Sequence, residues 1–137
     1  MLQDLPPQRW ETTAARQQVA RNLGLPYAEV MQDWPWEVAS PDRLADYRQL
    51  YACSSDDERV VLMELMLQAT TDLEESTVFA HAWHQVKELL DQHAALHAWS
   101  VHYWCCWSAG PEAGFEITPC LRAWWATHFP LPTLDGG

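Results

Sequence analysis

The sequence has very little positive charge. Its 137 residues contain 8 Lys and Arg, of which Lys87 is the single lysine, against 19 Asp and Glu, so the formal net charge is −11. A chain this acidic repels phosphate groups, which argues against binding to nucleic acid or to an anionic membrane surface. The same charge attracts basic proteins and steers them into contact, although it can also serve only to keep a protein soluble.

Long hydrophobic runs are also missing. No apolar stretch approaches the ~18 residues that a membrane-spanning helix needs, and the N-terminal segment MLQDLPPQRW lacks the cationic start and apolar stretch of a signal peptide. The four cysteines, Cys53, Cys105, Cys106 and Cys120, form no CxxC pair, and adjacent cysteines rarely bond to each other because the geometry is strained. We therefore expect reduced thiols and a cytoplasmic protein.

The motifs of common catalytic chemistry are absent as well. The chain has no HExxH, no Glu-x-x-His, no GxSxG and no SxxK, and its GPEAG segment (110–114) carries an acidic residue where a phosphate-binding loop needs lysine. Carboxylate pairs such as Asp42 with Asp46 and Glu74 with Glu75 occur in expected first turns and loops, where helix capping and solvation explain them. The sequence therefore predicts no catalytic residue and no cofactor.

One alternative is a metal or haem site built from histidine and cysteine. His81 and His84 are three residues apart, as are His102 and Cys105, and residues at that spacing share a helical face. Packing of these side chains within amphipathic helices is the ordinary explanation. We expect no metal, but an enzyme with a metal or haem held by these four residues remains the second hypothesis.

Helix start and stop signals recur along the whole chain. Thr12 or Thr13 can cap a helix that runs to about Leu23, with Gly24 at its C-terminal end. Ser40 can likewise cap a helix that has Pro41 at its first position, and Thr118 can cap a helix that has Pro119 at its first position. Such punctuation with short connections predicts an all-α single domain over residues 1–137, a bundle or irregular array of five to six helices, with residues 133–137 as a frayed tail.

Two segments are expected to depart from helix. The segment DWPWEVA (33–39) should be irregular, because Pro35 restricts the residue before it to extended conformations. The segment AGFEI (113–117) is the one place where the sequence allows a short extended piece.

Two helices are expected to be central because they are apolar almost all round. The first covers residues 56–71 and begins with a capping box of Ser55 and Glu58. The second covers residues 95–108, within LHAWSVHYWCCWSAG. Leu96, Trp99, Tyr103 and Cys106 fall on one of its faces, and Val101, Trp104 and Cys105 occupy much of the remainder. We interpret its aromatic residues and cysteines as core packing rather than as a chemical site.

The acidic charge is concentrated in one part of the chain. Residues 29–75 carry 12 carboxylates and only three arginines. Within them lies DWPWE (33–37), in which two tryptophans are flanked by Asp33 and Glu37. Aromatic side chains surrounded by carboxylates are typical of a surface that docks a basic protein, and equally of a loop pinned to the core. The predicted partner-binding residues are Asp33, Trp34, Trp36, Glu37, Asp42, Asp46, Asp56 and Asp57.

The order of the segments DWPWEVASPDRLADYRQLY, DDERVVLMELMLQA, HAWSVHYWCCW and FEITPCLRAWW resembles small acidic helical proteins encoded beside bacterial polymorphic toxins. Those proteins are immunity proteins, which bind a cognate toxin and block it. The resemblance covers about residues 33–125 and implies a non-enzymatic inhibitor of a secreted effector. Acidity fits a basic nuclease as the target, and an ADP-ribosyltransferase, a deaminase or a peptidoglycan hydrolase stays open.

The leading hypothesis is therefore an immunity protein that occludes the functional surface of a cognate toxin with a basic surface. A regulatory or adaptor domain with another protein partner is the third hypothesis, after the metal or haem enzyme. The presence of a toxin gene immediately upstream would favour immunity over an adaptor.

Overall fold

A computed structural model describes residues 8–28, 30–31, 33–107 and 114–129. The all-α prediction is confirmed, because these residues form seven α-helices and one 3₁₀ helix and contain no strand. The number of helices exceeds the expected five to six, and the predicted tail at 133–137 lies outside the described residues. The helices are α1 (Thr13–Leu23), α2 (Trp34–Val38), η1 (Pro41–Arg43), α3 (Leu44–Tyr51), α4 (Asp56–Thr71), α5 (Ser76–Gln92), α6 (Ala94–Trp104) and α7 (Thr118–His128).

Helix α4 is the centre of the fold, as its sequence predicts. It begins and ends at the expected residues and contacts α1, α2, α3, α5 and α6. Eleven of its residues are buried, from Val60 to Thr71 with the exception of Glu64. A helix covered on nearly every side must be apolar on nearly every side, and this explains the run of Val, Leu and Met that gave the prediction.

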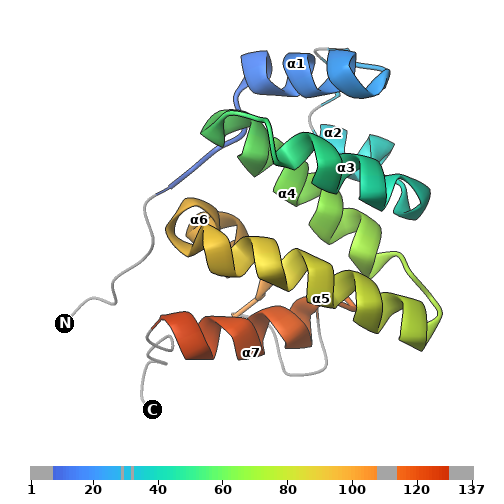
Figure 1. Cartoon of the computed structure of the whole chain (residues 1–137). Coiled ribbons are helices and arrows are strands. Elements are labelled where there is room, and N and C mark those ends of the chain that lie inside the picture. Colours follow the sequence, from blue (N-terminus) through green and yellow to red (C-terminus); the bar gives the residue numbers. More distant parts are fainter. Residues whose placement is uncertain (1–7, 29, 32, 108–113, 130–137) are drawn as a thin grey trace.

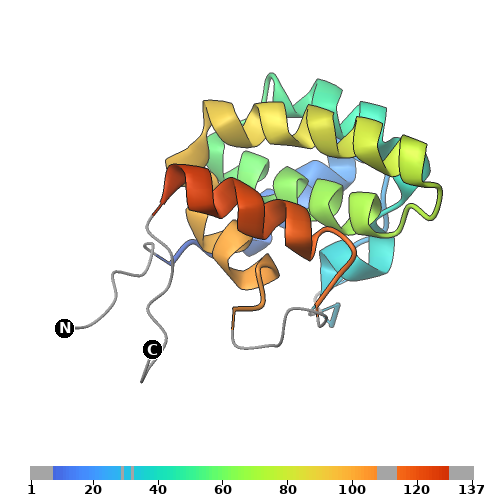
Figure 2. The same cartoon turned by 90° about the horizontal axis from the view of Figure 1, so that it is seen from below.

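The other helices are arranged around α4. Figure 1 shows α1 at one end of the molecule and α7 at the other, with α4 between them. Figure 2 shows α2 and the C-terminal end of α6 on the side opposite α3 and α5. None of the helices within the described residues is both long and apolar enough to cross a membrane.

The expected capping box starts α4. The Ser55 hydroxyl accepts a hydrogen bond from the Glu58 backbone N–H at 3.3 Å, and the Glu58 carboxylate accepts one from the Ser55 N–H at 3.4 Å. We expect Ser55→Ala to lower the free energy of unfolding by about 1 kcal/mol, because the Glu58 backbone N–H loses the hydroxyl that accepts its hydrogen bond. Urea denaturation measures the change. Ser76→Ala is the control, since Ser76 is exposed and Glu75 caps its helix; equal losses in both variants would contradict the assignment.

Other helix ends follow the sequence in part. Thr12 caps α1 as one of the two expected residues, and Gly24 ends it with φ of 67°, a left-handed conformation that favours glycine. The prediction that residues 33–39 are irregular is wrong, because Trp34–Val38 form α2. Pro35 lies in the first turn, where a backbone N–H has no partner within the helix and a proline is tolerated.

The prediction for the start of α7 is also wrong. Ile117 occupies the cap position, and the Thr118 hydroxyl donates a hydrogen bond to the Trp104 carbonyl at 2.8 Å and accepts one from the Phe115 N–H at 2.9 Å. Residues 114–117, in the segment where an extended piece was allowed, form turns and a bend. Thr118 thus ties the start of α7 to the end of α6 instead of capping its own helix.

Helix α6 is shorter than expected. It ends at Trp104 rather than near residue 108, and Cys106 has φ of 52° in the following turn. Arg122 of α7 donates to the Cys105 carbonyl at 2.6 Å and to the Cys106 carbonyl at 2.7 Å. These bonds satisfy carbonyls that a helix end leaves without a partner, so packing against α7 determines where α6 stops.

Helix α6 is buried mainly on one side, whereas core packing was expected nearly all round. Its buried residues are His97, Ala98, Ser100, Val101 and Trp104. On the face formed by Leu96, Trp99, Tyr103 and Cys106, Tyr103 is 68% exposed and the other three are partly buried. Because almost every position of this helix is apolar or aromatic, the pattern does not define which face turns inward.

Candidate functional site

The structure removes Trp34 from the predicted partner-binding residues. Its side chain is 0% exposed, its indole N–H donates to the Pro26 carbonyl at 2.7 Å, and its ring packs edge-on against Tyr27. Trp36, two residues later, is 68% exposed. Residues two apart on a helix point in nearly opposite directions, so α2 turns one of these tryptophans into the core and the other to solvent.

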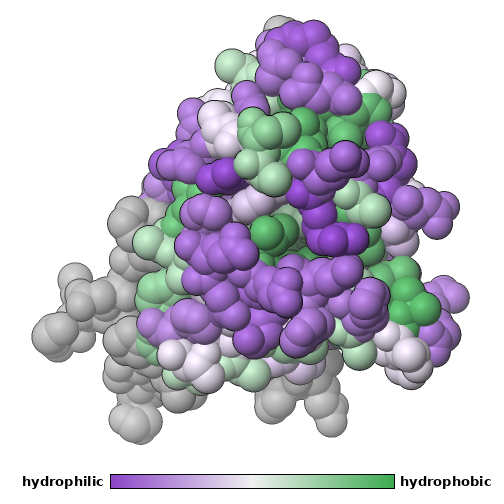
Figure 3. All heavy atoms as spheres, in the orientation of Figure 1, coloured by the Kyte–Doolittle hydropathy of each residue, from purple (hydrophilic) through white to green (hydrophobic). Residues whose placement is uncertain are grey.

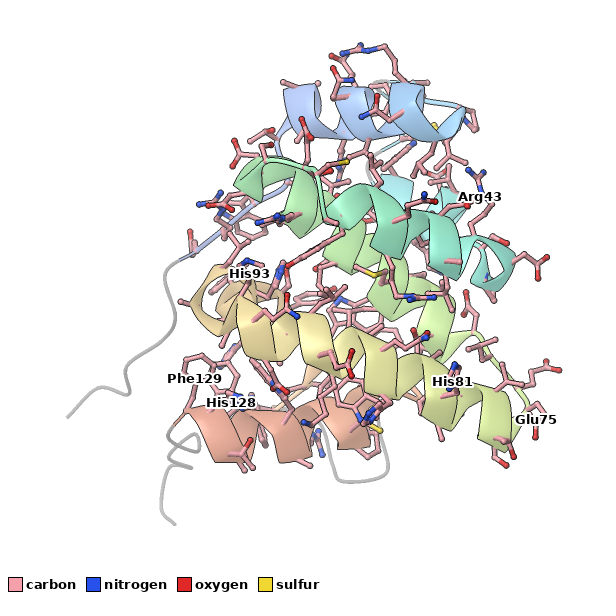
Figure 4. The ribbon with its side chains drawn as sticks, viewed as in Figure 1. Arg43, Glu75, His81, His93, His128 and Phe129 are labelled. Carbon is pink, nitrogen blue, oxygen red and sulfur yellow. The ribbon has the colours of Figure 1, made fainter. Side chains whose placement is uncertain are left out.

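The predicted acidic residues are all exposed but do not form one patch. Asp46 pairs with Arg43 at 2.6 Å, and Asp56 pairs with Arg59 at 3.8 Å. His93 lies 3.4 Å from Arg59, and Figure 4 shows His93 and Arg43 on opposite sides of the view. Asp46 and Asp56 thus lie near opposite ends of α3, and arginines of the same chain partly balance their charges.

The face that carries α3 and α5 offers no large apolar surface. Figure 3 shows it as mostly hydrophilic, with hydrophobic areas separated by polar side chains. Exposed single hydrophobic residues are ordinary on such a surface. A concave surface with aromatic side chains lies between other helices.

A groove runs between α1, α2, α4 and α6. It consists of two adjoining pockets of about 370 Å³ and 340 Å³ that share Glu11, Arg16, Asp33, Glu64 and Tyr103. Volumes of this size are typical of binding pockets. The residues that line the whole groove are Arg9, Trp10, Glu11, Arg16, Asp33, Pro35, Trp36, Glu64, Gln68, Trp99, Ser100, Tyr103, Trp104 and Phe115. We call this feature the acidic–aromatic groove.

Glu64 lies at the floor of the acidic–aromatic groove. It is the one charged residue in the apolar middle of α4, and its carboxylate accepts a hydrogen bond from the Trp104 indole N–H at 3.0 Å. Burial raises the pKa of Glu64 to about 7, and the nearby Glu11 carboxylate adds to this, while hydrogen bonds from Trp104 and Ser100 oppose it. At neutral pH Glu64 is therefore divided between its protonated and charged forms.

Glu11 and Arg16 form an ion pair at the wall shared by the two pockets. The Arg16 guanidinium donates to both carboxylate oxygens of Glu11, at 3.1 Å and 3.3 Å. Burial raises the pKa of Glu11, although its bond with Arg16 works in the opposite direction. The positive charge of Arg16 is thus paired with the carboxylate of Glu11.

Aromatic side chains stand exposed around the same groove. Trp36 and Tyr103 are each 68% exposed, Trp10 is 66% exposed, and Phe115 packs on Trp104 with ring centroids 4.5 Å apart. Large aromatic groups that remain in water are the residues most often responsible for binding energy at protein interfaces. The arrangement is suited to contact with another molecule.

A second cluster of perturbed groups is buried between α3, α4 and α6. The Tyr51 hydroxyl lies 2.6 Å from His97 Nε2 and 3.1 Å from His93 Nδ1, and Arg59 donates to the Tyr51 carbonyl at 3.0 Å. Burial lowers the pKa of His97 to about 3 and raises that of Tyr51 to about 12. Both groups stay neutral near pH 7. Since Tyr51 and His97 are inaccessible to solvent, this cluster joins helices rather than meeting a ligand.

The residues of the metal or haem hypothesis are not brought together. No group of three or more His, Cys, Asp or Glu in the described parts of the chain could hold a metal ion. His81 and His84 are exposed on α5, whereas His102 packs between Trp99 and Trp125. Burial raises the pKa of the Cys105 thiol to about 12, so it is a poor nucleophile and metal ligand at neutral pH.

Sequence reasoning found Asp33 and Trp36 of the groove but missed Glu11, Glu64 and Tyr103. A signal for Glu64 was present, because a lone carboxylate in a helix predicted to be central must be buried or face a cavity. Nothing in the sequence distinguished Tyr103, which lies in an aromatic-rich helix. The place of Glu11 in the groove depends on how the chain before α1 packs against α4. That packing is a tertiary property, which local sequence does not reveal.

Comparison of the chain with protein families, with curated proteins and with solved structures finds no match.

Proposed function

We propose that this protein is a non-enzymatic immunity protein, which binds a cognate toxin with a basic surface through the acidic–aromatic groove and occludes the functional surface of that toxin. The proposal includes a cytoplasmic site of action, which four free cysteine thiols support. It extends the sequence resemblance to a defined surface of the molecule.

The observation that carries the proposal is the combination of exposed rings and carboxylates in one concavity. Trp36 and Tyr103 stand at the groove, and neither Asp33 nor Glu64 forms an ion pair with another described residue within 4.0 Å. Rings provide area that leaves water on binding, and carboxylates favour a basic partner and speed its approach. Both requirements of a docking surface thus meet in one place.

We expect Trp36→Ala or Tyr103→Ala to weaken toxin binding by about 2 kcal/mol each, the range of interface residues that dominate affinity. The product of the adjacent gene, co-expressed and purified with the protein, provides the assay, together with growth of cells that express the toxin. Val78→Ala is the matched control, because Val78 is 49% exposed on α5 and does not line the groove.

A neighbouring gene product that is harmless to cells, or that forms no complex with the wild-type protein, would overturn the immunity proposal. A harmless product that nonetheless binds through Trp36 and Tyr103 would favour the adaptor alternative, because the groove then serves a regulatory partner.

A further inference from the structure

We propose that the pocket bounded by Asp33, Trp36, Glu64 and Tyr103 receives an arginine side chain of the protein partner. The partner's being a protein rests on the proposed function, whereas the preference for a guanidinium group rests on the geometry of the pocket itself. The pocket is the larger of the two that make up the acidic–aromatic groove, with a volume of about 370 Å³.

The charge of the pocket favours a cation. Three carboxylates, those of Glu11, Asp33 and Glu64, line it together with one cation, Arg16. Arg16 is held by Glu11 through two hydrogen bonds, so its charge is already shared with a closer carboxylate. A neutral or anionic occupant would exclude water from the remaining carboxylates and leave them without compensation, which is costly.

The walls of the pocket favour arginine over lysine. Trp36, Tyr103, Trp104 and Phe115 provide aromatic rings on the same lining as the carboxylates. A guanidinium group is planar, stacks on aromatic faces and meets a carboxylate with two parallel N–H donors, whereas an ammonium group is compact and strongly hydrated. A pocket that pairs rings with carboxylates matches the first group better than the second.

Proton binding to Glu64 should be linked to cation binding. The charged and polar groups that line the groove with this carboxylate are Arg9, Glu11 and Arg16 from the α1 region, Asp33 at the start of α2, Gln68 of α4, and Ser100, Tyr103 and Trp104 from α6. Of the two cations, Arg9 is paired with Asp57 at 2.7 Å and Arg16 with Glu11 at 3.1 Å. With the pKa of Glu64 at about 7, the charged fraction that attracts a cation rises about tenfold between pH 6 and pH 8. Affinity for a guanidinium group should rise by the same factor.

The test uses three small probes and no toxin. N-acetyl-arginine amide, N-acetyl-lysine amide and N-acetyl-citrulline amide are titrated at pH 6 and pH 8 into the full chain labelled with ¹⁵N, and the indole N–H signal of Trp104 reports the hydrogen bond to Glu64. We expect a saturable shift with the arginine probe, about tenfold tighter at pH 8, at least severalfold weaker binding of the lysine probe, and no binding of the uncharged citrulline probe.

Glu64→Gln should weaken the arginine probe by more than about tenfold at pH 8 and abolish the pH dependence, because it removes the charge and keeps the shape. Glu74→Gln, at an exposed position outside the groove, should leave both unchanged. The inference is overturned if the wild-type chain shows no saturable shift, if citrulline amide binds as tightly as arginine amide, or if both glutamine variants behave alike.

The same variants separate this inference from the proposed function. If Glu64→Gln loses the arginine probe but binds the toxin with wild-type affinity, the partner's arginine does not use this pocket while the immunity proposal stands. If the arginine probe binds as expected but no neighbouring gene product forms a complex, the immunity proposal fails and the guanidinium preference of the pocket stands.

Discussion

Trp34→Ala lowers the free energy of unfolding by about 3–5 kcal/mol, whereas Trp36→Ala changes it by less than about 0.5 kcal/mol. Trp34 is 0% exposed and its indole N–H bonds the Pro26 carbonyl, so its removal creates a cavity and leaves that carbonyl without its donor. Trp36 is 68% exposed, so its removal costs little packing. Denaturant unfolding followed by circular dichroism measures both variants under one set of conditions.

This pair of tryptophans is a matched comparison, because both lie in α2 and differ in the direction of the side chain. A loss of the expected size also removes a large part of the stability of an ordinary domain, which is about 5–15 kcal/mol. Equal destabilisation by the two variants would contradict the orientation of α2. It would also remove Trp36 from the proposed binding surface.

Glu64 makes the protein less stable as the pH rises from about 4.5 to about 7. The folded pKa of about 7 lies above the ordinary value of 4.5, so the folded state binds more protons than the unfolded state in this window. Stability is greatest where both states are protonated and falls as the buried carboxylate becomes charged. The full change, at pH 8 and above, is about 3 kcal/mol as an order of magnitude.

Glu64→Gln should remove this dependence. Its amide oxygen can still accept the Trp104 indole N–H and its side chain does not ionise. Relative to wild type, the variant should gain about 3 kcal/mol in unfolding free energy between pH 4.5 and pH 8, as measured by urea denaturation across that range. Glu74→Gln supplies the control. Parallel curves for wild type and Glu64→Gln would show that Glu64 carries no perturbed proton.

The features of the fold that could be predicted from the sequence are mostly those with a local signal. The limits of α4 follow from a capping box and an apolar run, and Gly24 marks the end of α1 because left-handed backbone favours glycine. These features depend on residues within one or two turns of each other. They are readable before any tertiary contact is known.

The remaining features depend on contacts between distant segments. Arg122 and Thr118 bond the last carbonyls of α6 from α7, and this ends the helix earlier than its sequence indicates. The orientation of α6 likewise depends on its neighbours, since apolar residues occupy nearly all of its faces. The groove could not be predicted from local signals alone, because its walls come from α1, α2, α4 and α6 and from the residues just before α1 and α2.

The central claim is that the acidic–aromatic groove is a surface for a basic protein. The most direct measurement is the solvent exposure of Trp36 and Tyr103 in a crystal structure of the complex with the neighbouring gene product. We expect both rings to become buried, with Asp33 and Glu64 facing basic side chains of that protein. A complex in which both rings keep the 68% exposure of the free chain, and the partner covers another face, would contradict it.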